Sequence, residues 1–222
     1  MRKTLFTASA LALALAAPFA QAFEAGDIIV RAGAVTVDPR EDSGEVKAGG
    51  APFAGSKATL DSNTQLGLNF AYMLTDKVGI ELLAATPFSH DVGVKGVAAG
   101  IDGKLGSLKH LPPTLSVIYY PLDKKSAFQP YVGAGVNYTW FFDTKLSSSA
   151  DQIFDGLDVK DSWGLAAQVG MDYMLTDNLM LNAQVRYIDI DTTGTTHLGS
   201  TKVKVDIDVD PFVYMVGLGY KF

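Results

Sequence analysis

The feature that most constrains this chain is a recurring alternation of bulky apolar residues with small or polar ones. Every second residue from Phe212 to Phe222 is bulky and apolar, whereas Gly217, Gly219 and Lys221 lie between them. Successive side chains of a strand point to opposite faces, so a period of two predicts a β-strand. The same pattern predicts eight strands over about 27–37, 65–72, 78–84, 111–121, 132–140, 167–173, 179–187 and 212–222.

The composition of the second face separates two fold classes. A soluble sandwich also alternates, but its apolar face is the inside. Here the second face carries Glu81, Asp172 and Arg186 together with many glycines, which suits a narrow polar interior. The bulky face is then expected to meet lipid, where strands must close into a barrel so that all backbone groups are paired. The predicted fold class is all-β, an eight-stranded antiparallel transmembrane β-barrel.

Residues 1–22 have the pattern of an export signal. Arg2 and Lys3 precede an apolar stretch, LFTASALALALAAPFA, and Ala20-Gln21-Ala22 offers a small-x-small cleavage site. A retained N-terminal anchor is the alternative. We therefore expect a signal peptide over 1–22 and a barrel domain over 23–222.

Charge and cysteine content exclude several classes of function. Without Arg2 and Lys3, 16 basic residues face 24 acidic ones, a net charge of −8, which argues against nucleic acid as a partner. The chain has no cysteine, which excludes thiol catalysis and cysteine-ligated metals. No apolar run of the length of a transmembrane helix follows the signal.

The connections predict which end of the barrel faces which side. Short connections at 74–77, 122–127 and 175–178 alternate with long ones at 38–58, 88–108, 147–161 and 192–200, as periplasmic turns alternate with extracellular loops. The pentapeptide YMLTD occurs at 72–76 and 173–177, so we interpret it as a girdle tyrosine followed by a periplasmic turn. Within the third long loop, 149–157 is a candidate helical turn. The expected girdles are Tyr72, Tyr173, Tyr220 and Phe222 below, and Trp140, Phe142 and Trp163 above.

Several stretches closely resemble the outer membrane protein W family, which includes the alkane-uptake porins of hydrocarbon-degrading bacteria. The resemblance covers nearly all of the mature chain. It implies a barrel in the outer membrane of a Gram-negative bacterium, with lipid and lipopolysaccharide around it. It also implies passage of small hydrophobic molecules and a link to stress responses. The stretches that carry it are EAGDIIVRAGAVTVDP (24–39), DSNTQLGLNFAYM (61–73), GIELLAATPFSH (79–90), HLPPTLSVIYYP (110–121), QPYVGAGVNYTWFFD (129–143), DSWGLAAQVGMDYML (161–175) and VDPFVYMVGLGYKF (209–222).

The inward-facing residues change character along the barrel. Near the periplasmic end they include Arg31, Glu81, Asp172 and Arg186, predicted here as a polar floor. Farther up they become aliphatic while the outward positions become acidic. This predicts an apolar funnel open to the extracellular side; the alternative is that its residues simply pack together as an extracellular core. The predicted funnel lining is Val35, Val37, Leu83, Ala85, Phe141, Ile188, Ile190, Val203, Val205, Ile207 and Val209.

Three prolines suggest a lateral exit from this funnel. Pro87 lies near the outer end of one predicted strand, and Pro112 and Pro113 lie near the outer start of the next. A proline has no N–H to donate to a ladder, so the wall between these strands is expected to be unpaired. The alternative is that the prolines only end the strands and stiffen the loop.

Acidic residues alternate outside the funnel, at Asp189 and Asp191 and again at Asp206, Asp208 and Asp210. They suit either divalent cations near lipopolysaccharide or cross-strand ion pairs with Lys202 and Lys204. We expect the ion pairs.

The three histidines, His90, His110 and His197, lie on or beside predicted loops without metal-ligand spacing, so no metal site is predicted. Ser89-His90-Asp91 is contiguous, and contiguous residues do not form a triad. Neither an enzyme nor a cofactor is predicted.

The expected function is therefore passive uptake of small hydrophobic molecules through the funnel, with lateral exit into the outer leaflet, by a monomeric barrel. The alternative is a structural, adhesive or stress-response surface protein without specific transport.

Overall fold

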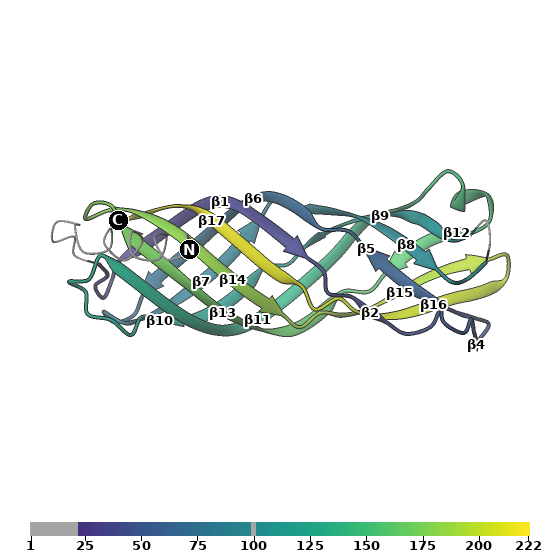
Figure 1. Cartoon of the computed structure of the whole chain (residues 1–222), viewed down its shortest axis with the longest axis horizontal. Helices are drawn as coiled ribbons and strands as arrows, with labels where there is room; N and C mark the ends of the chain where they lie inside the picture. Colours follow the sequence, from purple (N-terminus) through teal and green to yellow (C-terminus); the bar gives the residue numbers. More distant parts are fainter. Residues whose placement is uncertain (1–21, 99–100) are drawn as a thin grey trace, which may run out of the picture.

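The computed structural model describes residues 22–98 and 101–222, and these form one long barrel (Figure 1). Eight strands pair antiparallel in the order β10-β7-β6-β1-β17-β14-β13-β11, and β11 pairs with β10 to close the ring. The predicted eight-stranded barrel is confirmed. Its strands are β1 (Ile28–Asp38), β6 (Asn63–Met73), β7 (Val78–Ala85), β10 (Thr114–Tyr119), β11 (Phe128–Leu146), β13 (Ser162–Met174), β14 (Leu179–Ile188) and β17 (Phe212–Lys221).

Nine further strands of the described residues continue the wall beyond one end of this ring, on the right in Figure 1. We call this part the extension. Two of its strands, β8 and β9, pair with each other, and β9 also pairs with the upper part of the 19-residue β11. The strands are β2 (Asp42–Ser43), β3 (Lys47–Ala48), β4 (Ala51–Pro52), β5 (Lys57–Leu60), β8 (Phe88–Lys95), β9 (Gly103–Leu111), β12 (Asp155–Val159), β15 (Asp191–Leu198) and β16 (Thr201–Asp208).

The prediction of long loops is therefore wrong for most of 88–108 and 192–200 and for parts of 38–58 and 147–161. Glycines such as Gly93, Gly103 and Gly106 interrupt the apolar pattern there, although the backbone stays paired. Within the third segment, a short 3-10 helix at Ala150–Gln152 confirms the predicted helical turn. The predicted strand over 111–121 is shorter, since β10 spans only Thr114–Tyr119.

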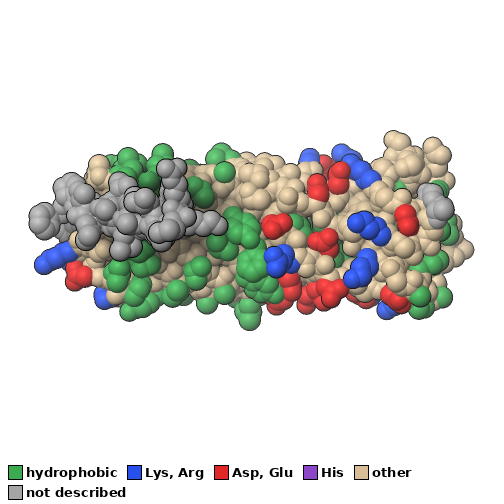
Figure 2. Space-filling model, viewed as in Figure 1, with side chains coloured by type: hydrophobic (Ala, Val, Ile, Leu, Met, Phe, Trp, Pro, Cys, Tyr) green, Lys and Arg blue, Asp and Glu red, His purple; other side chains and the backbone are tan. Residues whose placement is uncertain are grey.

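The outer face of the ring is apolar. Leu165, Val169 and Val216 expose 68%, 59% and 67% of their surface, as lipid-facing residues of a barrel do. Figure 2 shows hydrophobic side chains over the ring, whereas acidic and basic ones gather over the half that carries the extension. Among the predicted girdle residues, Trp140, Trp163, Tyr72 and Tyr220 are exposed. No helix of the described residues is long and apolar enough to cross a membrane.

The two YMLTD repeats form the same turn at the end of the ring opposite the extension. The Leu74 N–H donates to the carbonyl of Val78 at 2.8 Å, and the Leu175 N–H donates to that of Leu179 at 2.8 Å. In each copy the threonine hydroxyl, of Thr75 or Thr176, accepts an N–H from the residue three positions on at 2.9 Å. The repeat is thus a strand end followed by a tight turn, as predicted.

The signal peptide predicted over 1–22 lies outside the described residues except for Ala22. The next residue, Phe23, is buried at the turn end of the lumen, where its ring centroid lies 4.6 Å from that of Tyr120. Ala22, Phe23 and Tyr120 belong to one buried apolar cluster below the polar interior.

Candidate functional site

The four residues predicted as a polar floor lie together in the lumen of the ring. Arg31 (β1), Glu81 (β7), Asp172 (β13) and Arg186 (β14) are at most 1% exposed. Arg31 Nη2 lies 2.6 Å from Asp172 Oδ2, and its Nη1 lies 3.3 Å from Glu81 Oε2. Glu81 Oε1 in turn lies 2.6 Å from Arg186 Nη2. Two cations and two carboxylates therefore alternate across the lumen.

Neutral side chains complete this network. The Tyr120 hydroxyl donates to Asp172 Oδ2 at 2.8 Å, and Gln168 Nε2 donates to Glu81 Oε1 at 2.8 Å. Tyr131 accepts a hydrogen bond from Asn182 at 3.2 Å and donates one to Gln184 at 3.1 Å. The buried charges of the lumen are thus paired with one another and mostly hydrogen-bonded.

Above the floor, the predicted funnel residues are mostly buried against one another. Val35, Val37, Leu83, Ile188, Ile190, Ile207 and Val209 belong to one buried cluster, and Ala85, Phe141 and Val205 pack against it. Val203 belongs to a second cluster, in the extension, with Val46, Val94, Leu105 and Phe154. Much of the predicted lining thus forms a packed core. This is the arrangement that the alternative hypothesis, an extracellular core, predicted.

This core and the second cluster together line a cavity of about 100 Å³. Seven of the predicted lining residues border it, whereas Val35, Leu83, Ala85 and Ile188 do not. The seven are Val37, Phe141, Ile190, Val203, Val205, Ile207 and Val209. The cavity is smaller than the roughly 150 Å³ void that holds a benzene ring. A solute of that size or larger therefore requires the side chains that line the cavity to move.

Two histidines that sequence reasoning placed on loops lie in the wall of this cavity. His90 (β8) and His110 (β9) are 3% and 5% exposed, and their Nε2 atoms are 2.9 Å apart. The His110 ring also stacks on Phe88, with centroids 5.4 Å apart, and lies 5.7 Å from that of Phe141. Burial, with a further contribution from His90, lowers the pKa of His110 to about 3. Burial likewise lowers the pKa of His90.

The three prolines lie at an interruption of the wall. The ladder between β7 and β10 runs from Val78↔Tyr119 to Leu83↔Thr114, and pairing resumes between β8 and β9 at Phe88↔His110. Residues 84–87 and 111–113 lie between, with no β7–β10 ladder among the described residues, and we call this stretch the seam. Pro87 and Pro113 are exposed there and Pro112 is buried. None of the three borders the cavity.

The backbone groups beside the seam bond to the strands on its far sides. Asn137 Nδ2 donates to the Pro113 carbonyl at 3.1 Å, and the Tyr138 N–H donates to the same carbonyl at 3.2 Å. The Thr86 N–H donates to the Leu66 carbonyl of β6 at 3.0 Å. Pro113 is thus bonded to β11 and Thr86 to β6, on the sides away from the seam, and among the described residues no backbone hydrogen bond crosses the seam.

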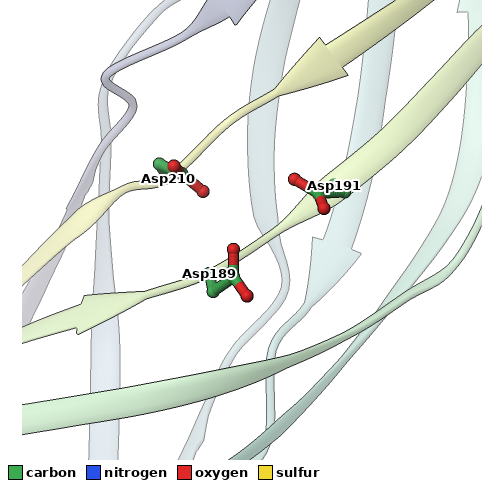
Figure 3. A group of neighbouring side chains, drawn as sticks. All are labelled: Asp189, Asp191 and Asp210. Atoms are coloured by element: carbon green, nitrogen blue, oxygen red, sulfur yellow. The ribbon is translucent and has the colours of Figure 1, made fainter.

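An acidic cluster lies at the outer edge of β14. One carboxylate oxygen each from Asp189, Asp191 and Asp210 lies within 4.8 Å of the others (Figure 3). Burial, followed by the charges of Asp189, Asp208 and Asp210, raises the pKa of Asp191. The register places Asp191 directly opposite Asp208. Exposed acidic groups of this kind are common in proteins without a bound metal ion.

The predicted ion pairs of this region are wrong. The register places Lys202 opposite His197 and Lys204 opposite Thr195, away from Asp189 and Asp191. Lys204 instead pairs with Asp206 of its own strand, at 2.8 Å. A shift of a few positions along the ladder separates the two charge patterns, and this shift is not visible in the sequence.

Comparison with known proteins decides the family. The model of the OmpW family matches residues 24–222.

The chain belongs to the OmpW family.

Two relatives and one solved structure show how close the match is. The chain is 44% identical to outer membrane protein W of Vibrio cholerae over the full length of both chains. It is 31% identical to outer membrane protein AlkL of Ectopseudomonas oleovorans, over 82% of this chain and 76% of the relative. The crystal structure of the outer membrane protein OprG from Pseudomonas aeruginosa is 54% identical, with a TM-score of 0.87, and the match covers 91% of this chain and 98% of that one.

Membership of the OmpW family places the barrel in the outer membrane, with its apolar belt in lipid. Outer-membrane barrels have short turns on the periplasmic side and long connections outside, so the extension is expected on the extracellular side and the YMLTD turns on the periplasmic side. The seam is at the level of the exposed outer-girdle residue Trp140, because Trp140 pairs with Leu111 at the edge of the seam.

Some residues of this OmpW-family site were not predicted. Tyr120 and Tyr131 of the floor network follow inward parity, so alternation alone was sufficient to place them in the lumen. The cavity residues Leu60, Val92 and Leu108 were missed because they lie within or beside segments predicted as loops. In β8, every second residue from Phe88 to Val94 is buried, and all of these except His90 are apolar. This period of two could have predicted the strand.

Proposed function

We propose that this protein mediates passive uptake of small hydrophobic molecules, which enter from the extracellular side and leave laterally into the outer leaflet. One observation carries the proposal: an apolar cavity lies above a closed polar floor, and an unpaired seam lies beside the same apolar core. We further propose that the barrel acts as a monomer surrounded by lipid and lipopolysaccharide, because its ladder closes within one chain.

Entry is favoured by the apolar lining. Burial of apolar surface contributes about 25 cal/mol per Å², and the lining side chains Val37, Ile190 and Val209 offer such surface to a solute. The cavity must widen as the solute enters. The short strands β2, β3 and β4 form part of the surrounding wall, and two-residue strands have few ladder bonds to resist this movement.

The floor argues against passage straight down. An apolar solute offers no hydrogen bonds to replace those between Arg31, Asp172 and Glu81. Breaking a buried ion pair costs about 3–5 kcal/mol when one charge is left without its partner. A hydrophobic molecule in the cavity is therefore expected to leave sideways.

The seam is the proposed exit. Leu83 and Phe88 flank it and belong to the same buried cluster as the cavity residues Val37 and Ile190. Apolar side chains therefore connect the cavity to the seam, so a solute can move between them without meeting the polar floor. Because no ladder bonds cross the seam among the described residues, opening it breaks fewer hydrogen bonds than opening a paired stretch of the ring.

One observation favours the rival function, a structural, adhesive or stress-response role without transport. The funnel residues pack against one another and leave only about 100 Å³ between them. A core of this kind stabilises an extracellular domain whether or not a solute enters it. Uptake of a hydrophobic solute by cells with and without the protein separates the two functions: equal uptake, with changed cell adhesion, supports the rival.

The lateral exit is tested by closing the seam with a disulfide, since the chain has no cysteine of its own. If the ladder continued past Leu83↔Thr114, Ala84 would lie opposite Pro113. The variant Ala84→Cys/Pro113→Cys is expected to lose uptake when oxidised and to regain it on reduction. The control Leu82→Cys/Leu115→Cys links two residues already paired in the same ladder and is expected to transport in both states.

A second variant tests the prolines themselves. Replacing Pro87 with valine restores an N–H and a strand-forming side chain at the seam. Uptake is expected to fall at equal surface expression. Unchanged uptake in this variant and in the oxidised seam variant would rule out the lateral exit.

A further inference from the structure

One residue that lines the cavity, His110, carries a buried polar atom that the proposed function does not use. The lining residues Thr192 and Thr196 donate their hydroxyl protons to backbone carbonyls of residues 160 and 156. In contrast, His110 Nδ1 is buried and has no hydrogen-bond partner among the described residues. It is the only unpartnered buried side-chain atom of this part of the chain that belongs to a cavity-lining residue.

The hydrogen bonds of the two histidines determine which nitrogens carry protons. His90 Nδ1 lies 2.5 Å from the backbone carbonyl of Asp61, and a carbonyl can only accept, so this nitrogen is protonated. In a neutral His90 the Nε2 is then an acceptor. The Nε2 of His110, 2.9 Å away, must therefore be the donor, which leaves His110 Nδ1 with a lone pair.

Both rings are expected to be neutral at ordinary pH. Burial lowers the pKa of His110 to about 3, and it also lowers the pKa of His90 despite the nearby Asp61 carboxylate. The free Nδ1 of His110 is accordingly an acceptor and not a donor. Burial of an unpaired acceptor is unfavourable, so a ligand that supplies a proton donor removes a penalty that an apolar ligand leaves in place.

We infer that His110 Nδ1 selects, among slender hydrophobic solutes, those with a hydroxyl or N–H donor, such as aliphatic alcohols. This inference rests on the proposed function and adds a specificity to it. When the lining side chains move to admit a solute, the aliphatic residues would cover its alkyl part, and His110 Nδ1 would become able to accept the donor's hydrogen bond. Ethers and carboxylates present only lone pairs to this nitrogen, so they are disfavoured relative to an alcohol of the same length.

The experiment uses the full mature chain in phospholipid nanodiscs, with ¹⁵N-labelled histidine. The three histidines give separate ring-nitrogen signals, which report protonation and hydrogen bonding at each nitrogen. The probes are 1-pentanol, butyl methyl ether and n-hexane, which match in length, and each affinity is referred to the probe's concentration in the bilayer. The alcohol is expected to bind about 2- to 10-fold more tightly than the ether, the range that one neutral hydrogen bond supplies. Only the alcohol is expected to shift the His110 Nδ1 signal.

Two variants accompany the wild type. His110→Phe keeps an aromatic ring beside Phe88 and Phe141 but removes the acceptor, so the preference for the alcohol is expected to disappear while hexane still binds. His197→Phe, at an exposed position of β15 outside the cavity lining, is the matched control and is expected to keep the preference.

The outcomes separate the inference from the proposed function. If none of the three probes binds, the uptake function itself fails. If all three bind with equal affinity in the wild type, or if His110→Phe keeps the alcohol preference, uptake stands and the role of His110 is wrong. If His110→Phe does not fold, the wild-type ¹⁵N signals still decide: an Nδ1 signal unmoved by saturating pentanol overturns the inference.

Discussion

Arg31 Nη2 and Asp172 Oδ2 lie 2.6 Å apart in the lumen, with both side chains fully buried. The two residues are 141 positions apart in sequence and come from β1 and β13, which are not neighbours in the ring. Their pair therefore crosses the lumen and joins opposite parts of the wall. It links two strands that no ladder joins directly, so its contribution to stability extends beyond any one pair of neighbouring strands.

Replacing Asp172 with asparagine is expected to destabilise the barrel by about 3–5 kcal/mol, because it leaves the buried Arg31 charge without its closest partner. The free energy of unfolding in urea, measured in lipid or detergent, checks this. Asp76→Asn is the control. Asp76 pairs with Lys124 at 3.3 Å but is about half exposed, so its loss should cost less than about 1 kcal/mol. Equal costs for both variants would mean that the floor is not a tightly paired network.

Filling the cavity is expected to reduce uptake without unfolding the protein. In Val37→Phe the larger ring occupies space that a solute needs, and overpacking of a core costs about 1–3 kcal/mol. The lipid-facing variant Val216→Phe introduces the same ring at a position that is 67% exposed. Uptake by cells at matched surface levels should fall only in the first variant. If both variants transport normally, the cavity is not on the path.

The turn hydroxyls offer a prediction about the YMLTD repeats. Thr75→Val removes the acceptor for the Val78 N–H, and Thr176→Val removes the equivalent acceptor for Leu179. Each is expected to cost about 0.5–1.5 kcal/mol, and the double variant should show the sum because the two turns are separate. Urea unfolding measures all three. A cost for one threonine and none for the other would show that the repeats are not equivalent.

The alternation of residue types predicted which side chains face inward. It did not predict which of them contact each other across the lumen. Alternation places Glu81 and Arg186 inside the barrel, because each lies between outward apolar residues. Their contact at 2.6 Å depends on the register of eight strands, and a shift of one residue reverses every face. The same dependence explains why Lys204 was wrongly predicted to pair across strands.

Most of the extension, apart from β16, was missed for a different reason. Its strands contain glycines and charges, and such composition is typical of loops. In β9, Gly106 lies so close to β11 that a Cβ there would be 2.2 Å from the Lys145 carbonyl oxygen, so the glycine permits tight pairing instead of a loop. Since His90 and His110 lie in these strands, the error also removed both histidines from the predicted site.

The last prediction concerns acid. In the unfolded chain a histidine has a pKa near 6.5, whereas burial lowers that of His110 to about 3 in the folded protein. Below pH 6.5 the unfolded state therefore binds more protons, and stability is lost as the pH falls from about 6.5 toward 3. His90, whose pKa is also lowered, adds to this loss, and the Asp61 carboxylate, 3.7 Å from its Nδ1, reduces it.

From pH 7.5 to pH 5, His110 alone is expected to cost about 2 kcal/mol of the free energy of unfolding. The measurement is urea unfolding at both pH values, and the difference between them should shrink by about that amount in His110→Phe. His197→Phe should leave it unchanged, because that side chain is exposed. If the pH dependence is the same in wild type and in His110→Phe, His110 is able to take up a proton in the folded barrel. Water then reaches the cavity wall more easily than the burial of this residue indicates.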